Sequence, residues 1–439
     1  MLEVGKTYKT QNGIAVNITK AGSRGGQGQV YFAKKSDGTE CVVKYIFNPN
    51  ETIKKNIEEH YAKRKILPQD FVWPEGLIDC NTNGIAYVME KVSPEYKQLV
   101  EFIWPDRLTG KLATFDSIEI QIKTCINIIS GFRNLNLKGY YYQDMSDNNF
   151  FINPHTGDIK IIDTDNVCNG TEKPTVLGTF GFMAPEIIRG DSIPSQYTDL
   201  FSLAAILFCI FCRGNPLMGA LYRGYRMPSD KEKKLVFGEK PVFVLDKDDK
   251  TNRPVQSLDD GVINFWGVCP PELQVAFRKA FSKEALLDPS KRLNYKEWLK
   301  IFLDLRAKLV ICSACGVQYS GSLSHCPYCK TQKTNFKFLK FIGKKEDDIP
   351  IYPGKKIYGY DIDKDVNSIS IIGEVIRSKK NPKIWGIVNR SDNHWTYLET
   401  ENNRTYNLEK GEVLQFPSCK LELSFTNNVK AIIDMKGDN

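Results

Sequence analysis

The chain has 439 residues, of which 41% are hydrophobic and 26% are charged, and its formal net charge is +8. This composition is typical of an ordinary globular protein and excludes an intrinsically disordered chain, and the length allows two or three domains of about 150 residues each. Positive and negative side chains alternate along the sequence, so a solvated surface is favoured over a nucleic-acid-binding patch.

The N-terminus, the apolar segments and the cysteines bear on cellular location. The first residues, MLEVGKTYKT, have neither the basic start nor the apolar core of a secretory signal. The longest apolar run, LAAILFCIFC at 203–212, is about half the length that a membrane span requires. Eight of the twelve cysteines are scattered through apolar segments, where thiols act as small hydrophobic groups. We therefore expect a cytoplasmic protein without membrane contact.

The predicted elements change in type along the chain. Segments between 14 and 47 (IAVNIT, QVYFAKK and CVVKYI) are typical of strands joined by glycine turns. A helix is predicted over 51–67, with Ile53, Ile57, Ala62 and Ile66 on one face, and FVWPEGLI and GIAYVME are strand-like again. From about 116 to 307 the apolar period is mainly helical. The prediction is an α+β arrangement, a small β lobe followed by a larger helical lobe.

Two segments of the β lobe suit phosphate binding. In AGSRGGQGQVY at 21–31, the glycines Gly25, Gly26 and Gly28 would let backbone N–H groups approach phosphate oxygens. Lys44 ends the strand CVVK, and a lysine on the buried side of a strand needs a carboxylate partner. The helix at 51–67 offers Glu58 and Glu59. Glu59 is preferred, because the apolar positions then face the lobe.

Three polar residues of the helical lobe complete the pattern. Asp144 in YYYQDMSDNNFF is suited to orient the proton of an acceptor hydroxyl, and Asn149 to bind a metal through its amide oxygen. Asp163 ends the strand IKIID and is a hard oxygen ligand suited to Mg²⁺ on phosphates. Order and spacing together predict transfer of a phosphoryl group from ATP with Mg²⁺.

On these residues, 14–307 resembles a eukaryotic-like bacterial Ser/Thr protein kinase domain. The resemblance implies a bilobal protein kinase fold over 1–309, with an N-lobe of about 1–92 and a C-lobe of about 93–309. It implies a nucleotide site formed by the glycine loop through Val30, by Val42 over the adenine, by Met89 as gatekeeper, and by the backbone from Glu90 to Val92.

The resemblance extends to the C-terminal half of the kinase-like segment. GTFGFMAPE at 178–186 matches the end of an activation segment, which favours a protein substrate. Asp199 matches the aspartate that supports the catalytic loop, and Arg292 matches the arginine that pairs with Glu186. A looser resemblance, to bacterial kinases of stress or tellurite-resistance loci, implies a von Willebrand-type protein and a metal-dependent phosphatase as partners.

Several positions depart from the kinase pattern. Tyr142 and Gln143 replace the usual His-Arg before Asp144, which makes the chain a non-RD type and leaves no arginine there to bind a phosphorylated loop. Ser146 replaces a lysine near the transferred phosphate, a loss of about 3 kcal/mol or roughly a hundredfold in rate. Asp165 follows Asp163 and Thr164, and a position facing solvent is favoured over additional metal binding. An active kinase is favoured over a nucleotide-binding pseudokinase scaffold, because the lysine, the metal ligands and the carboxylate are all present.

A cysteine cluster follows the kinase-like segment, at 310–334. The four cysteines Cys312, Cys315, Cys326 and Cys329 form two CxxC pairs with ten residues between them. Four thiolates at this spacing close a tetrahedron around Zn²⁺ at about 2.3 Å, with iron of the rubredoxin type as the minor alternative. A site filled by four cysteines predicts a structural zinc ribbon with His325 as a bystander.

Residues 335–439 predict an all-β module of six to nine strands. A sandwich similar to a forkhead-associated (FHA) domain and an OB-type barrel both fit, but the phosphothreonine-binding residues of the first are not found. Trp385 and Trp395 beside basic residues could stack nucleic-acid bases, which would make the chain a nucleic-acid-associated regulator, but core positions are favoured. We expect a module that docks partner proteins.

Overall fold

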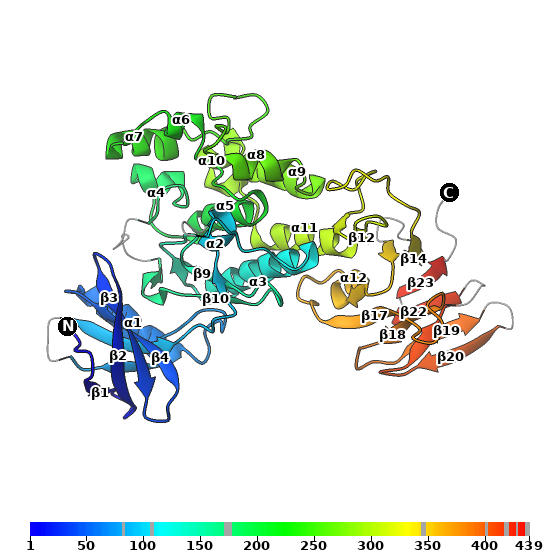
Figure 1. Cartoon of the computed structure of the whole chain (residues 1–439), viewed down its shortest axis with the longest axis horizontal. Coiled ribbons are helices and arrows are strands. Elements are labelled where there is room, and N and C mark those ends of the chain that lie inside the picture. The colour runs from blue at the N-terminus through cyan, green and yellow to red at the C-terminus, as the bar shows by residue number, and fades with distance from the viewer. Residues whose placement is uncertain are drawn as a thin grey trace. The chain divides into compact units, whose positions relative to one another are not determined.

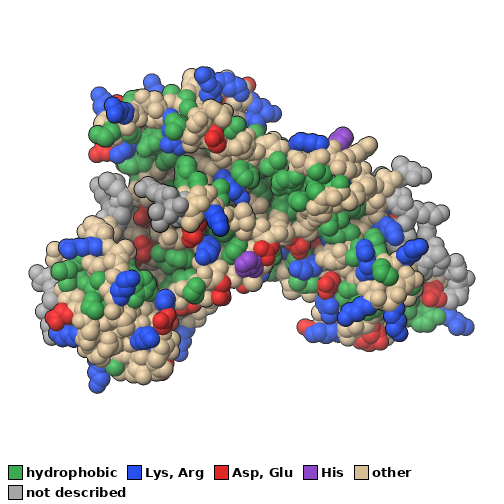
Figure 2. Space-filling view, viewed as in Figure 1, with side chains coloured by type: hydrophobic (Ala, Val, Ile, Leu, Met, Phe, Trp, Pro, Cys, Tyr) green, Lys and Arg blue, Asp and Glu red, His purple; other side chains and the backbone are tan. Residues whose placement is uncertain are grey.

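The computed structural model divides into two units (Figure 1). Unit 1 consists of Met1–Asp116, Lys123–Trp266 and Phe277–Tyr295, and unit 2 of Ser117–Ile122, Gly267–Ala276 and Lys296–Asn439. The structure describes residues 1–80, 84–105, 109–170, 178–343, 348–399, 403–416, 421–426 and 429–434. On the face shown in Figure 2, basic side chains are interspersed with acidic ones over both units, as the alternating charges of the sequence predict.

Unit 1 begins with an antiparallel six-stranded sheet in the order β1-β2-β3-β4-β6-β5. Its strands are β1 (Thr7–Lys9), β2 (Ala15–Arg24), β3 (Gly28–Lys35), β4 (Glu40–Ile46), β5 (Gly76–Ile78) and β6 (Ile85–Glu90). Because side chains alternate across a strand, the sheet has apolar residues on both faces. One face forms a cluster around Val16, Val43 and Val88, and the other packs against the following helix.

That helix, α1 (Glu51–Lys63), is shorter than predicted. It begins where the Asn50 side chain accepts a hydrogen bond from the backbone N–H of Ile53, which satisfies one of the unpaired donors of the first turn. Ile57 and His60 are its buried residues. The prediction over 51–67 was wrong at its end, since Ile66 lies beyond α1 and is 64% exposed.

The rest of unit 1 is mainly helical and lies beside the sheet in Figure 1. Its elements are β7 (Lys97–Gln98), α2 (Val100–Ile103), β8 (Tyr141–Tyr142), β9 (Phe150–Ile152), β10 (Ile159–Ile161), β11 (Val167–Cys168), α4 (Pro185–Arg189), α5 (Gln196–Cys212), α6 (Ala220–Arg223), α7 (Asp230–Lys234), α8 (Asp260–Trp266) and α10 (Lys283–Leu287), while α3 (Ile118–Leu137) and α9 (Pro271–Ala280) contribute residues to both units. The apolar run 203–212 is the buried part of α5. Within the described part of the chain, no helix combines the length and hydropathy needed to cross a membrane.

Unit 2 contains all but the first residue of one long helix, and the two sheets of the C-terminal module. The helix is α11 (Tyr295–Ala307), and the short strands β12 (Leu309–Ile311) and β13 (Gln318–Ser320) pair after it. One sheet has the order β15-β14-β23-β22-β19-β20 and the other β16-β17-β18-β21. The elements of the module are β14 (Lys337–Phe341), β15 (Ile349–Ile351), β16 (Lys356–Tyr358), α12 (Gly359–Asp363), β17 (Ile371–Arg377), β18 (Trp385–Asn389), β19 (Trp395–Glu399), β20 (Arg404–Leu408), β21 (Val413–Gln415), β22 (Leu421–Thr426) and β23 (Val429–Asp434).

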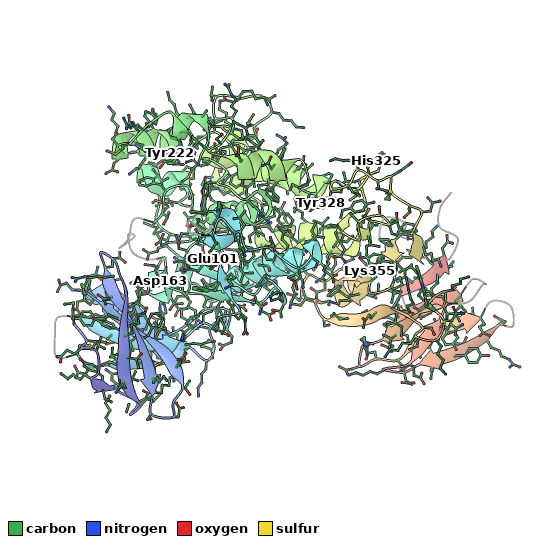
Figure 3. All side chains as sticks on the ribbon, in the orientation of Figure 1. Glu101, Asp163, Tyr222, His325, Tyr328 and Lys355 are labelled. Carbon is green, nitrogen blue, oxygen red and sulfur yellow. The ribbon has the colours of Figure 1, made fainter. Side chains whose placement is uncertain are left out.

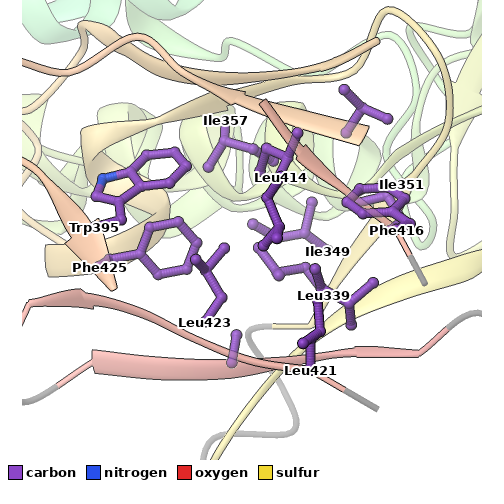
Figure 4. Packing of buried hydrophobic residues seen from close by; sticks show 14 of the residues in the cluster. Leu339, Ile349, Ile351, Ile357, Trp395, Leu414, Phe416, Leu421, Leu423 and Phe425 are labelled. Carbon is purple, nitrogen blue, oxygen red and sulfur yellow. The ribbon is translucent and has the colours of Figure 1, made fainter. Parts of the chain in front are cut away.

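The two sheets of the module share one apolar core, which Figure 4 shows from close by. Leu339 and Leu423 come from one sheet and Ile387 from the other. Two separate sheets across one core make a sandwich, with more strands than the six to nine predicted. Membership of the FHA family stays a prediction. Trp395 is 2% exposed in this core and Trp385 packs partly against it, as the core interpretation predicts.

Candidate active site

Lys44 and two aspartates form the polar centre of unit 1. The Nζ atom of Lys44 lies 2.8 Å from Oδ1 of Asp165 and 3.1 Å from Oδ1 of Asp163. Lys44 is 8% exposed. Burial lowers the pKa of Lys44, but attraction to Asp165 and Asp163 outweighs burial and leaves that pKa above its ordinary value. The lysine is therefore charged and held by both carboxylates. Figure 3 shows Asp163 between the sheet and the helices of unit 1.

The predicted pairing of Lys44 with Glu59 was wrong in this structure. Glu59 accepts hydrogen bonds from Lys63, at 2.7 Å on the same helix, and from the Tyr140 hydroxyl. Both donors lower the pKa of Glu59. The rotation of α1 points Ile57 and His60 into the lobe, so the glutamate between them is directed to the side. The carboxylate of Glu59 thus has its hydrogen-bond donors without any contact with Lys44.

Asp165 was also predicted incorrectly, since it does not face solvent. Its side chain is 7% exposed, and its Oδ1 accepts a 2.9 Å hydrogen bond from the Tyr87 hydroxyl in addition to that from Lys44. Burial opposes ionisation of Asp165, but Lys44 outweighs burial and its pKa lies below the ordinary value. Asp163 has a left-handed backbone (φ 60°), which begins the short turn that directs Asp165 back toward the sheet.

Asp144 and Asn149 lie together in the loop between β8 and β9. The amide nitrogen of Asn149 donates to the Asp144 backbone oxygen at 2.8 Å, which leaves Oδ1 as the amide atom with metal-ligand chemistry. The backbone N–H and the hydroxyl of Thr179 both donate to Oδ1 of Asp144 at 3.0 Å. The end of the predicted activation segment therefore contacts the candidate catalytic carboxylate. Thr171 and Thr175, two further threonines between Asp163 and Thr179, lie outside the described residues.

Hydrogen bonds join this loop to the loop of Asp163. The Tyr142 hydroxyl donates to the Ile162 backbone oxygen at 2.7 Å, and the Ile162 N–H donates to the Asn149 backbone oxygen at 3.0 Å. Strand β8, which precedes Asp144, also pairs with β11, which follows the turn of Asp163. The structure thus joins the loop of Asp144 and Asn149 to the segment that leads into Asp163 in one hydrogen-bonded assembly.

Asp199 supports the Asp144 loop from the buried helix α5. Its carboxylate accepts hydrogen bonds from the Asn136 side chain at 2.9 Å and from the Tyr142 backbone N–H at 3.3 Å. Asp199 is 1% exposed. Burial raises the pKa of Asp199 to about 8, and the two donors oppose this shift. The contact with Tyr142 matches the supporting role that the sequence predicts.

The glycine loop and an apolar group complete the predicted nucleotide site. Gly25 N–H donates to the Gly28 oxygen at 2.9 Å, and a Cβ at Gly28 would collide with the carbonyl oxygen of Tyr45. Val30 lies on the same strand. Gly26 and Gly25 have open space where a Cβ would be.

The apolar group comes mainly from β4 and β6. Val42 pairs with Met89 across β4 and β6, and Val42, Val92 and Ile162 pack against the cluster that contains Met89. Glu90 ends β6, with its side chain bound to Lys160 at 2.7 Å. These apolar side chains have the chemistry that an adenine ring requires, and recognition of adenine by the backbone after Met89 stays a prediction.

The four cysteines of unit 2 converge as predicted. The sulfurs of Cys312, Cys315, Cys326 and Cys329 all lie within 4.8 Å of one another, with Cys312–Cys329 at 3.5 Å and Cys315–Cys326 at 3.7 Å. A tetrahedron with Zn–S bonds of about 2.3 Å has S–S edges of about 3.8 Å. The residues that follow the two pairs, Gly316 and Lys330, both have positive φ. The convergence of the four sulfurs is therefore compatible with a single zinc ion. His325 is not part of the cluster.

Sequence reasoning missed two tyrosines, Tyr87 within the site and Tyr140 as the partner of Glu59 beside it. Tyr87 lies directly opposite Lys44 on β6 and donates to Asp165, and Tyr140 binds Glu59. A buried tyrosine usually needs a hydrogen-bond partner, so the tyrosine inside the apolar segment IAYVME was a usable signal. Its partner lies 78 residues away, beyond the reach of motif spacing.

Comparison with known proteins places this geometry in context. Residues 17–300 match the family described as protein kinase domain. The chain is 26% identical over 119 residues to the serine/threonine-protein kinase PSK2 of Saccharomyces cerevisiae, an alignment that covers 25% of the chain and 11% of that protein. It is 25% identical over 118 residues to PSK1 of the same organism, covering 25% of the chain and 9% of that protein. The chain therefore spans only about a tenth of the length of the curated relatives it matches.

Proposed function

Because the chain belongs to the protein kinase family, we propose that it is a Ser/Thr protein kinase that transfers the γ-phosphoryl group of ATP to a protein hydroxyl. The observation that carries the proposal is the hydrogen-bonded assembly of Asp144, Asn149 and Asp163 beside the buried Lys44. These are the groups that phosphoryl transfer requires in one place.

Each residue has a role that follows from its contacts. Asp144 would orient the acceptor hydroxyl. The Thr179 hydroxyl, which donates to Asp144, would hold this carboxylate next to the end of the predicted activation segment. Asn149 and Asp163 would hold Mg²⁺, which neutralises charge on the phosphates when bound. Lys44 would position the α and β phosphates. The glycine loop, Val42, Met89 and the backbone from Glu90 to Val92 would hold the nucleotide.

The test is single-turnover transfer of labelled phosphate from Mg²⁺ and ATP by the purified full chain, to itself and to a general protein acceptor. We expect Asp144→Asn to lower the rate at least about a hundredfold, since it removes the group that orients the hydroxyl. Asp158→Asn is the matched control, because it removes a surface ion pair with Lys123 at 2.9 Å. Equal phosphate transfer by the wild type and by Asp144→Asn would contradict the proposed activity and favour a nucleotide-binding scaffold.

We further propose that the four-cysteine cluster holds a structural Zn²⁺. Four sulfurs leave no position for water or substrate, so the ion would stabilise the segment and take no part in the transfer. The sandwich module would dock partner proteins. The predicted von Willebrand-type and phosphatase partners stay predictions.

A further inference from the structure

We propose that Asp165, and not a glutamate of α1, holds Lys44 in position on the nucleotide phosphates. This inference rests on the proposed phosphoryl transfer and names the residue that positions its lysine. Asp165 acts through Lys44 and touches no reacting atom, so it is a positioning residue. The consequence is that the lysine is coupled directly to the metal-binding loop, and no acid of α1 is its partner.

The buried carboxylate of Asp165 accepts hydrogen bonds from two side chains of the sheet, Lys44 and Tyr87. Both of its carboxylate oxygens accept from Lys44 Nζ, at 2.8 and 3.1 Å, and the Tyr87 hydroxyl donates to Oδ1 at 2.9 Å. Lys44 and Tyr87 are direct partners in the register of β4 and β6. The sheet therefore presents two adjacent donors, and one buried carboxylate binds both. Charge-assisted hydrogen bonds of this kind are stronger than neutral ones.

The acids of α1 are not available for this role. Glu51 and Glu58 are exposed, and Glu59 is bound to Lys63 and Tyr140. The buried polar residue of the helix is His60, which is 1% exposed and whose Nδ1 has no hydrogen-bond partner among the described residues. The helix thus directs an imidazole and apolar side chains into the lobe. The anion for Lys44 comes from the loop instead.

The two aspartates near Lys44 differ in exposure, which separates their roles. The side chain of Asp163 is 31% exposed and that of Asp165 is 7% exposed. Asp163 can therefore turn to Mg²⁺ while Asp165 keeps its contact with the lysine. Binding of a metal to Asp165 would compete with the hydrogen bonds that its carboxylate accepts from Lys44 and Tyr87. The sequence Asp-Thr-Asp thus provides a metal ligand and a lysine anchor on one short turn.

This arrangement predicts which movement would switch the site. Where a helix glutamate holds the strand lysine, displacement of the helix breaks the pair. Here the pair joins β4 to the turn of Asp163, so displacement of α1 does not in itself remove the carboxylate bound to Lys44. Displacement of the 163–165 turn would release the lysine and withdraw a metal ligand in one step.

Binding of Mg²⁺ and a non-hydrolysable ATP analogue to the full chain, measured by titration calorimetry, tests the anchor together with the transfer rate. We expect Asp165→Asn to weaken binding of the analogue about tenfold and to lower kcat/KM for ATP about thirtyfold. Glu59→Gln should change either quantity by less than about threefold. In a Lys44→Met background, Asp165→Asn should change binding by less than about twofold, because the residue acts through the lysine. A merely structural role would give additive effects.

The other outcomes are decisive as well. Equal losses from Glu59→Gln and Asp165→Asn, or additive losses with Lys44→Met, would overturn the anchor. A wild-type chain that transfers no phosphate but shows the Lys44–Asp165 coupling in binding would refute the proposed function and leave the anchor standing. Should thermal melting show that Asp165→Asn does not fold, Tyr87→Phe removes one hydrogen bond of Asp165 and should weaken binding about threefold. Unchanged binding in that variant would count against the anchor.

Discussion

Arg292 and Glu186 form a buried ion pair with two parallel hydrogen bonds, Nη1 to Oε1 at 2.6 Å and Nη2 to Oε2 at 2.7 Å. Both side chains are nearly inaccessible, at 2% and 6% exposure. Arg292 also donates to the backbone oxygens of Tyr197 and Ala285. The pair therefore joins α4 to the segment after α10 and to the first turn of α5.

We expect Arg292→Met to lower the free energy of unfolding by about 3 to 5 kcal/mol, because it leaves the buried Glu186 carboxylate unpaired. The double variant Arg292→Met with Glu186→Leu should recover part of that loss. Urea denaturation measures both. Asp191→Asn, which breaks the exposed pair with Arg189, is the matched control and should cost less than about 1 kcal/mol. A loss of that small size for Arg292→Met would contradict the structural role.

Thr179 offers a prediction about activity. Thr179→Ala removes the hydroxyl that donates to Asp144 but keeps the backbone donor, so we expect kcat to fall about tenfold. Thr179→Ser retains the hydroxyl and should stay within about threefold of the wild type. Phosphoryl transfer at saturating ATP is the measurement, with melting temperatures recorded for both. If the two variants were equally impaired, the hydroxyl would have no part in orienting Asp144.

His60 gives a prediction about pH. Burial is the main cause that lowers its pKa to about 4, with Lys63 acting in the same direction and Glu59 and Asp165 opposing it. Between its ordinary pKa of 6.5 and about 4, the unfolded chain binds a proton that the folded chain does not. The stability contributed by neutral His60 is therefore complete above pH 6.5 and is lost as the pH falls, by about 3 kcal/mol over that window.

The measurement is chemical denaturation of the wild type and of His60→Phe at several values between pH 4.5 and 7. Phenylalanine keeps the ring packing against Trp73 and Tyr140, whose centroids lie 5.2 and 5.7 Å away. The difference between the two proteins isolates the histidine, because all other groups titrate in both. We expect His60→Phe to be favoured increasingly as the pH falls. A difference independent of pH would show that His60 is not buried in its neutral form.

The cysteine cluster predicts metal content. We expect about one zinc per chain by elemental analysis of protein kept in reducing buffer. Cys326→Ser should lower zinc content and the melting temperature, because Cys326 is fully buried in the small core around Tyr319. The matched control replaces Cys209 and Cys212, a CxxC pair inside α5, by alanine and should leave the zinc content unchanged. Absence of zinc from the wild type would refute the site.

Lys355 predicts how α11 is stabilised at its end. Its Nζ donates to the backbone oxygens of Arg306 at 3.0 Å and Ala307 at 2.7 Å, which are orphan acceptors of the last helical turn (Figure 3). Lys355→Met would leave both buried oxygens without this donor, so we expect a loss of about 2 kcal/mol or more in the free energy of unfolding. Hydrogen exchange at the end of α11 should rise in parallel. Unchanged exchange there would contradict the capping role.

The sequence determined the parts of the site that lie within short segments. Asp144 and Asn149 share one loop, Asp163 comes just after the second strand that follows this loop, and the four cysteines lie in two short CxxC pairs. In each case the residues are brought together by a local turn, so their spacing carries the geometry. The β alternation and the apolar stripe of α1 also follow from local periodicity.

Only the tertiary structure decided the partner of Lys44. The sequence offered Glu58 and Glu59 as candidates, whereas the partner in the structure is Asp165, which is 121 residues from the lysine. Neighbouring positions on a helix differ by about 100° in direction, so the small rotation that packing imposes on α1 determines which side chain faces the sheet. The left-handed turn at Asp163 then directs a residue expected in solvent into the interior.

The C-terminal module shows the same division. Its strands were predictable because alternation and turn residues are local, but the division into two sheets was not. The pairing of β14 with β23 joins opposite ends of the module, and no local signal specifies it. Turns, strands and helix faces depend on residues that are close in sequence, so local patterns predict them. Partners far apart in sequence depend on how all the elements pack together, and no local pattern specifies that.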